Sequence, residues 1–199
     1  MKIQELIRDI THWEMMKGAI YPCLAPRRWE KVRSLRAISR RFLDLAVYYI
    51  VRADDGDDMA STYVNIPLMR TWGIDMDTLD AQARENAKKD GYTIRDIGEF
   101  IGAAPSTEMY VMTNRYGRYG AAGMLDEAML AQFADTKGAD IYILPSCVHE
   151  LILLPTTWID DRQELDEIVK DVNACVVGPE DRLADHAYRY ERSGDIRMI

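Results

Sequence analysis

The feature that most constrains the fold of this 199-residue chain is a long apolar stretch followed at once by a turn. Residues 42–53 are rich in β-branched and aromatic side chains, with Asp44 as an interruption, and predict the longest strand. The run from Asp54 to Asp58 contains an Asp-Gly pair, which is typical of a hairpin turn. Met59–Ile66 then supplies a second strand. Because so short a connection joins them, the two strands must pair antiparallel.

The same arrangement recurs in the second half of the chain, where short turns separate most of the predicted strands. The strands expected besides the first pair are Ala19–Leu24, Glu108–Thr113, Tyr119–Met124, Ile141–Leu144, Leu151–Leu154 and a last hairpin over Tyr188–Ile199. Helices are expected over 3–17, 27–36, 67–72, 76–90 and 125–137, and after the capping box that begins at Asp161. The order predicts an α+β protein with mostly antiparallel sheets built from hairpins and helices inserted between them.

The best candidate for a linker is Gly102–Thr107, because it combines Gly, Ala, Pro, Ser and Thr. It would divide the chain into an N-terminal lobe, 1–104, and a C-terminal lobe, 105–199. One continuous domain is the alternative. A chain of this length buries roughly 70% of its unfolded surface, so its core needs neither a metal nor a disulfide.

The net charge of −8 conceals an asymmetry along the chain. Residues 1–53 hold eleven Lys and Arg against five Asp and Glu, a net +6, which leaves −14 for the remainder. An acidic body repels phosphates over most of its surface and so disfavours general nucleic-acid binding.

Seven of the basic residues lie in the short segment from Arg27 to Arg41, with a tryptophan among them. The segment predicts a binding patch for nucleic acid or for an acidic protein face. The alternative is internal pairing with the 28 acidic residues after residue 53. The candidate binding residues are Arg27, Arg28, Trp29, Lys31, Arg33, Arg36, Arg40 and Arg41.

A second candidate site is the segment Cys147-Val-His149-Glu150. In an extended segment Cys147 and His149 point to the same side, and a thiol beside an imidazole is a possible activated nucleophile. No family-specific cysteine signature surrounds them, so a buried Cys147 with His149 and Glu150 at a hairpin rim is the competing interpretation.

A third candidate is the loop that carries Arg115 and Arg118 among Gly117, Gly120 and Gly123. Glycine and arginine after a strand and before a helix can hold an anion. The spacing matches neither a dinucleotide fingerprint nor a Walker loop, and a tight hairpin turn explains the same glycines.

The remaining motifs predict no metal and no cofactor. The three cysteines, Cys23, Cys147 and Cys175, are far apart and odd in number, which favours free thiols in a reducing compartment. His149-Glu150 lacks the second histidine of a zinc-protease helix, since Leu153 stands there. No signal peptide or membrane-spanning stretch is visible, so we expect a soluble cytoplasmic protein.

Several blocks of the sequence occur together, in the same order, in one bacterial family. They are Arg40–Tyr49, Trp72–Ile74, Met109–Asn114, Tyr119–Ala122, Tyr142–Ser146, Val148–Glu150, Val172–Asn173 and Tyr188–Arg192. With them the chain resembles the family called domain of unknown function 5688, over nearly its whole length. Members are common in gut Clostridia, in the Firmicutes, and occur in their mobile elements. The family's Pro-Ser-Ser is Pro145-Ser146-Cys147 here, which weakens the interpretation of Cys147 as a nucleophile.

The resemblance implies a bacterial cytoplasmic origin and a link to mobile elements, but no established activity. Three hypotheses follow. The first is a non-enzymatic protein that binds a protein partner, such as a component of a host defence system. The second is a nucleic-acid-binding accessory protein that uses Arg27–Arg41. The third is a small hydrolase or transferase that uses Cys147, His149 and Glu150. We expect no membrane partner, and self-association remains open.

Overall fold

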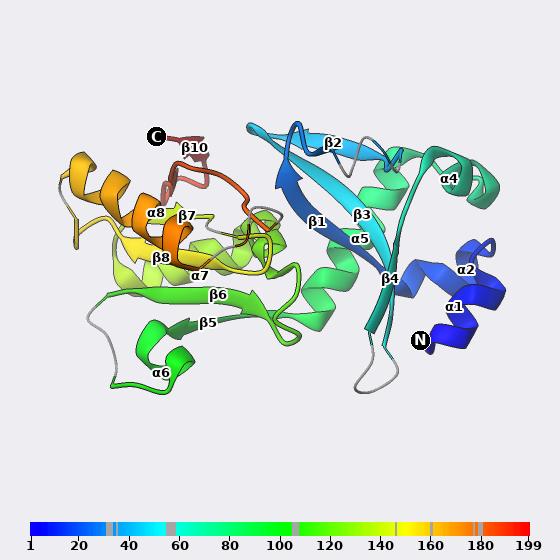
Figure 1. Ribbon diagram of the computed structural model, residues 1–199, viewed down its shortest axis with the longest axis horizontal. Coiled ribbons are helices and arrows are strands. Elements are labelled where there is room, and N and C mark those ends of the chain that lie inside the picture. The colour runs from blue at the N-terminus through cyan, green and yellow to red at the C-terminus, as the bar shows by residue number, and fades with distance from the viewer. Residues whose placement is uncertain are drawn as a thin grey trace. The chain divides into compact units, whose positions relative to one another are not determined.

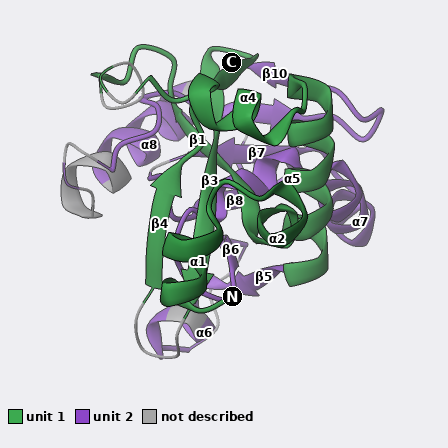
Figure 2. Ribbon diagram, turned by 90° about the vertical axis from the view of Figure 1, so that its right-hand side faces the viewer, with its two compact units in different colours: residues 1–90 green, residues 91–199 purple. Residues whose placement is uncertain are grey.

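The computed structural model describes residues 1–30, 34, 36–54, 59–104, 108–145, 147–159, 161–176, 178 and 181–199. The predicted Asp-Gly turn, Lys31 and Arg33 lie outside these residues. The chain forms two compact units, Met1–Asp90 and Gly91–Ile199 (Figure 2). Each unit holds its own antiparallel sheet together with helices, which confirms the predicted α+β class.

Unit 1 contains a sheet built around the longest strand (Figure 1). Its strands are β1 (Ile20–Pro26), β2 (Ser39–Phe42), β3 (Leu45–Asp54) and β4 (Met59–Tyr63). β1 pairs along one side of β3, while β2 and β4 follow one another along the other side. The predicted hairpin of β3 with β4 is therefore confirmed. The predicted strand over 42–53 starts too early, because the chain turns at Leu43 and Asp44 and β2 folds back onto β3.

The predicted single helix over 3–17 is wrong. The segment forms α1 (Ile3–Asp9), α2 (Trp13–Met16) and the 3-10 turn η1 (Lys17–Ala19). The reason lies far along the chain: the indole N–H of Trp72 donates to the Ile10 carbonyl at 2.8 Å, and the Trp13 and Trp72 rings are in contact at 5.6 Å. Because the Ile10 carbonyl has a side-chain donor, it needs no backbone N–H from a further helical turn.

Of the two later helices of unit 1, α5 (Met76–Asp90) begins at its predicted residue and α4 (Ile66–Trp72) begins one residue before its predicted start at Pro67. α4 is capped by Asn65, whose side chain accepts the Leu68 N–H at 2.9 Å. α5 begins after Asp75, whose carboxylate accepts the Thr78 N–H at 2.8 Å. Such caps satisfy backbone donors that the first helical turn leaves free. Pro26, by contrast, ends β1, and Arg27 and Arg28 form a turn, so the helix predicted over 27–36 does not begin at Arg27; within that range Glu30 and Ser34 are helical.

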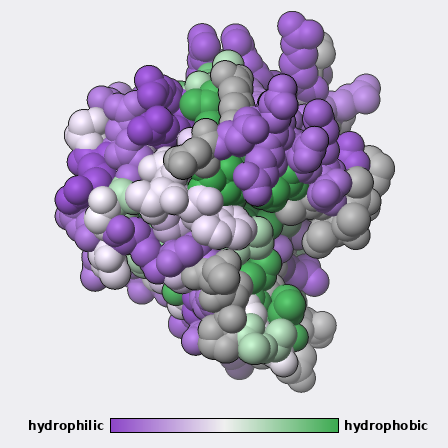
Figure 3. Space-filling model, turned by 90° about the vertical axis from the view of Figure 1, so that its left-hand side faces the viewer, coloured by the Kyte–Doolittle hydropathy of each residue, from purple (hydrophilic) through white to green (hydrophobic). Residues whose placement is uncertain are grey.

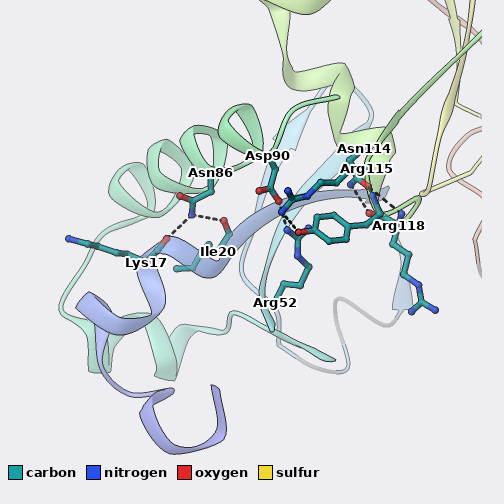
Figure 4. A network of polar contacts seen from close by, with 9 residues as sticks. Lys17, Ile20, Arg52, Asn86, Asp90, Asn114, Arg115 and Arg118 are labelled. Atoms are coloured by element: carbon teal, nitrogen blue, oxygen red, sulfur yellow. Dashed lines mark hydrogen bonds and ion pairs between the residues drawn. The ribbon is translucent and has the colours of Figure 1, made fainter. Parts of the chain in front are cut away.

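α5 packs against β1, and polar side chains fix its place (Figure 4). The buried amide of Asn86 donates to the carbonyl of Lys17 at 2.6 Å and to that of Ile20 at 2.9 Å. At the end of the helix, Asp90 pairs with the buried Arg52, whose guanidinium lies 3.7 Å from the centre of the Tyr21 ring. Buried polar groups of this kind are stable only because they have partners.

Unit 2 contains a second antiparallel sheet, in the order β10-β9-β7-β8-β6-β5. Its strands are β5 (Tyr92–Asp96), β6 (Tyr110–Asn114), β7 (Ile141–Leu144), β8 (Leu151–Pro155), β9 (Tyr188–Tyr190) and β10 (Ile196–Met198). The β7–β8 and β9–β10 hairpins confirm the prediction. β5 was not predicted; because it pairs with β6, the unit boundary lies after Asp90 and differs from the predicted boundary at 104/105.

The helical elements of unit 2 are α6 (Ile97–Ile101), η2 (Gly120–Leu125), α7 (Glu127–Lys137) and α8 (Arg162–Val176). α7 and α8 were predicted. On α8, Leu165 and Val169 join a core cluster with Leu144 and Leu154 of the sheet. The predicted strand Tyr119–Met124 is wrong, since Gly120–Leu125 forms a 3-10 helix. None of the helices formed by described residues has both the length and the apolarity needed to cross a bilayer.

Candidate functional site

The exposed basic residues of unit 1 gather at one end of its sheet. Pro26 ends β1 and Phe42 ends β2, and both are in register with Leu45 at the start of β3. Arg27 and Arg28, which follow β1, therefore lie at the same sheet end as Arg41. We call these three residues the arginine end. All three are exposed, and none forms an ion pair with another residue that the structure describes.

Arg40, the neighbour of Arg41 on β2, has a different environment. Its Nη1 lies 3.0 Å from an oxygen of Asp77 and 3.3 Å from one of Asp80, both on α5. Asp80 also accepts the Tyr49 hydroxyl at 2.7 Å. Burial raises the pKa of Tyr49, and its hydrogen bond to Asp80 adds to the increase. For Arg40, therefore, the geometry matches the internal-pairing alternative.

Trp29 and Arg36 complete the part of the basic segment that the structure describes. The Trp29 ring contacts the fully buried ring of Tyr48, with 5.8 Å between their centres. The indole thus packs the segment onto β3. Arg36 is exposed, precedes β2 and has a left-handed φ of 51°.

The loop that carries Arg115 and Arg118 is held by a side chain. Asn114 Oδ1 accepts the N–H groups of Tyr116 at 3.0 Å and Arg118 at 3.4 Å, and Nδ2 donates to the Arg118 carbonyl (Figure 4). The Gly117 N–H donates to the Asn114 carbonyl. A phosphate loop offers its backbone N–H groups to the anion, whereas here these three donors already have protein acceptors.

The side chains of Arg115 and Arg118 remain exposed on this loop. The Arg115 guanidinium lies over the Tyr116 ring, 4.6 Å from its centre. Any anion at this loop would therefore depend on these two side chains.

The structure brings this loop together with the Cys147–Glu150 segment, which the sequence treats as a separate candidate. His149 Nδ1 accepts the Tyr119 N–H at 3.2 Å, and the two rings lie 5.8 Å apart. The Thr113 hydroxyl donates to the His149 carbonyl at 2.8 Å. The other ring nitrogen, Nε2, lies 3.6 Å from an oxygen of Asp181. We call His149, Tyr119 and Asp181 the His149 cluster.

The geometry of this cluster does not activate the thiol. A general base needs a ring nitrogen facing the proton that it takes. Both nitrogens of His149 face other groups, and the Cys147 sulfur is bound instead by the His149 backbone N–H at 3.3 Å. Burial raises the pKa of Cys147, and the Glu150 charge adds to the increase. Burial also raises the pKa of the half-buried Glu150.

The comparisons with known proteins give one result. The model of a family described as "Family of unknown function (DUF5688)" matches residues 1–192. The chain belongs to this family. No curated protein and no solved structure matches it.

Three important partners in this DUF5688 protein were missed by the sequence reasoning. Asp77 and Asp80 bind Arg40, and their spacing of three on a helix is a signal that places both on one face. Asp181, which faces His149, carries no comparable local signal. In the part of the chain that the structure describes, no group of three or more His, Cys, Asp or Glu is arranged to hold a metal ion.

Proposed function

We propose that this protein is a binding protein whose arginine end holds an acidic surface of a partner protein. The observation that carries the proposal is the set of three exposed guanidinium groups at one sheet end, none paired with an acid among the described residues. β1 and β3 are mostly buried, and β3 is hydrogen-bonded to both β1 and β2, so the charges stand on a rigid base. Arginine binds carboxylates through two parallel hydrogen bonds, which gives geometric selectivity as well as affinity.

Two observations favour a protein partner over nucleic acid. Single-stranded nucleic acid is held by basic grooves with aromatic rings that stack on bases. Here Trp29, the aromatic residue within the basic segment, is already packed on Tyr48. Unit 1 carries fifteen Lys and Arg against fourteen Asp and Glu, and unit 2 carries ten against nineteen. The resulting −9 charge of unit 2 repels phosphate. The face seen in Figure 3 is mostly hydrophilic.

The family resemblance indicates in which cell such a partner would occur. If members travel on mobile elements of gut bacteria, a protein of the host cell is the natural partner, and a component of a defence system fits the first hypothesis. The protein would act by occupying a surface of this partner, and such a role needs no catalytic site. This agrees with a His149 cluster whose ring nitrogens face Tyr119 and Asp181.

The experiment measures binding of labelled poly-L-glutamate and of an oligothymidylate at low and moderate salt. The variant Arg27→Gln/Arg28→Gln should weaken poly-glutamate binding about tenfold, because two charge-assisted contacts are lost. Arg70→Gln/Lys88→Gln is the matched control: it removes the same charge from exposed residues of α4 and α5. Equal weakening by both variants, or no binding at low salt, overturns the proposal. Tighter binding of oligothymidylate that only the first variant reduces would assign the arginine end to nucleic acid instead.

A further inference from the structure

The outer edge of β2, beside the arginine end, pairs with no strand formed by the described residues. β2 is the terminal strand in the order β1-β3-β2, so only one of its sides pairs with β3. Two hydrogen bonds fix the direction of its backbone groups: the Tyr49 carbonyl accepts the Val64 N–H, and the Val64 carbonyl accepts the Ile38 N–H. On this side of the sheet, therefore, the backbone groups of Tyr49 in β3 and of Ile38, just before β2, point inward, toward the neighbouring strand.

Backbone groups in a strand alternate in direction from one residue to the next. Since Ile38 points inward, Arg40 and Phe42 do so as well, and Ser39 and Arg41 point away from β3. The N–H and C=O groups of Ser39 and Arg41 have no backbone partner among the described residues. Both residues are exposed. They present two donors and two acceptors in the spacing that an added strand requires.

The two faces of this edge differ in charge. Side chains alternate between faces, so Arg41 and Ser39 point to one face and Arg40 to the other. Arg41 is exposed and has no acidic partner among described residues, and its Nε donates to the Leu43 carbonyl at 2.8 Å. On the opposite face Arg40 is already bound by Asp77 and Asp80. A strand added to this edge has the unpaired charge of Arg41 on one face. On the other face it has Asp77 and Asp80, which neutralise Arg40.

We infer that the acidic partner of the proposed function binds as an extended segment added to β2, with acidic residues at alternate positions. The inference rests on that proposed function and specifies how its partner binds. The segment's backbone bonds to Ser39 and Arg41, and its carboxylates lie on the Arg41 face. The intervening positions are uncharged, because a carboxylate there would face Asp77 and Asp80.

The probe is a labelled ten-residue peptide of alternating Glu and Thr, and the readout is fluorescence anisotropy. A peptide of the same composition with five Glu followed by five Thr should bind at least about fivefold more weakly, since only alternation puts all carboxylates on one face. Two further peptides carry N-methyl groups on every Glu or on every Thr amide. One of the two should lose binding, because an added strand bonds to β2 through only one of its edges.

On the protein side, Ser39→Pro removes an outward N–H and leaves the bonds between β2 and β3 in place. It should weaken the alternating peptide about tenfold, while Ser39→Ala, which keeps the N–H, should bind like the wild type. If Ser39→Pro does not fold, the N-methylated peptides decide the question on the wild-type protein. If both N-methylated peptides bind like the parent while Arg27→Gln/Arg28→Gln still weakens poly-glutamate, the strand mode is wrong and the proposed function stands. If no acidic probe binds, both fail.

Discussion

The imidazole of His149 lies with Nε2 3.6 Å from a carboxylate oxygen of Asp181. Nδ1 accepts a backbone N–H from Tyr119, so this nitrogen carries no proton and Nε2 presents its own proton toward Asp181. In a hydrolytic triad the carboxylate holds Nδ1 and leaves Nε2 to the nucleophile. Here the orientation is reversed, and the ring joins two segments of unit 2.

This role predicts the response to substitution of His149. His149→Ala should lower the free energy of unfolding by about 1–3 kcal/mol, because the Tyr119 N–H loses its acceptor. His149→Asn places an amide oxygen near the position of Nδ1 and should recover a large part of that loss. Urea unfolding measures both. Equal losses in the two variants would contradict the assignment of Nδ1 as the acceptor that matters.

A second prediction concerns the thiol of Cys147. Burial raises its pKa above the ordinary value, so the thiolate is scarcer at neutral pH than in a free cysteine. Alkylation by iodoacetamide at pH 7.5, followed at this site by mass spectrometry, should be at least about tenfold slower than alkylation of glutathione. The rate should rise only at clearly alkaline pH. A rate above that of glutathione would restore the enzyme hypothesis for Cys147, His149 and Glu150.

Local signals made the starts of α5 and α8 predictable, whereas α7 was predicted from Leu125 and begins two residues later, at Glu127. Asp75 and Asp126 each accept a backbone N–H in the first turn of the following helix, and Asp161 accepts that of Gln163. Each interaction spans two or three residues, so the sequence alone contains both partners. Hairpins were predictable for the same reason, since a short turn leaves adjacent strands little choice but antiparallel pairing.

The errors come from contacts between distant residues. The helix over 3–17 breaks at Ile10 because Trp72 binds its carbonyl, a contact across 62 positions. The strand predicted over Tyr119–Met124 is instead the 3-10 helix Gly120–Leu125, whose Ala121 N–H donates to the Val148 carbonyl. The partner of His149, Asp181, follows a helix whose length and direction no local pattern specifies. No local pattern separates Arg40, which pairs with Asp77 and Asp80, from its neighbour Arg41, which has no acidic partner among the described residues.

The third prediction concerns the close approach at Gly120. A Cβ built there would overlap Thr113 Oγ1 and the His149 carbonyl oxygen and lie 2.8 Å from the Asn114 nitrogen. Two of these atoms belong to the backbone and cannot rotate away. Gly120→Ala should therefore lower the free energy of unfolding by about 1–3 kcal/mol, the usual cost of overpacking.

Gly18→Ala is the matched control for this substitution. A Cβ at Gly18 meets nothing within 4 Å, and its φ lies outside the left-handed region. It should leave stability unchanged to within about 0.5 kcal/mol. Urea midpoints of the two variants test the pair, and a neutral Gly120→Ala would show that the loop and the His149 segment are not in contact.

The last prediction concerns Asp140, which links β7 to β9 in unit 2. One of its oxygens accepts the Arg192 N–H at 3.0 Å, and the other lies 2.5 Å from the Arg189 guanidinium. The Arg192 N–H and the Arg189 pair lower the pKa of Asp140. A carboxyl whose pKa is lower in the folded than in the unfolded state stabilises the fold above the unfolded value, near 4, and loses that contribution as pH falls through the folded value.

Asp140→Asn should therefore lower the free energy of unfolding by about 1–2 kcal/mol at pH 7, because a charged acceptor with two partners becomes neutral. The difference between wild type and variant should shrink as pH falls below about 4, since the wild-type carboxyl is then protonated as well. Asp135→Asn removes an exposed carboxylate 3.1 Å from Arg192 and should cost less than about 0.5 kcal/mol, because exposed ion pairs contribute little. Unfolding curves at several pH values measure the three proteins together. A loss in Asp140→Asn that stays constant down to pH 3 would mean that the amide disturbs packing and that the ionised carboxylate contributes no stability.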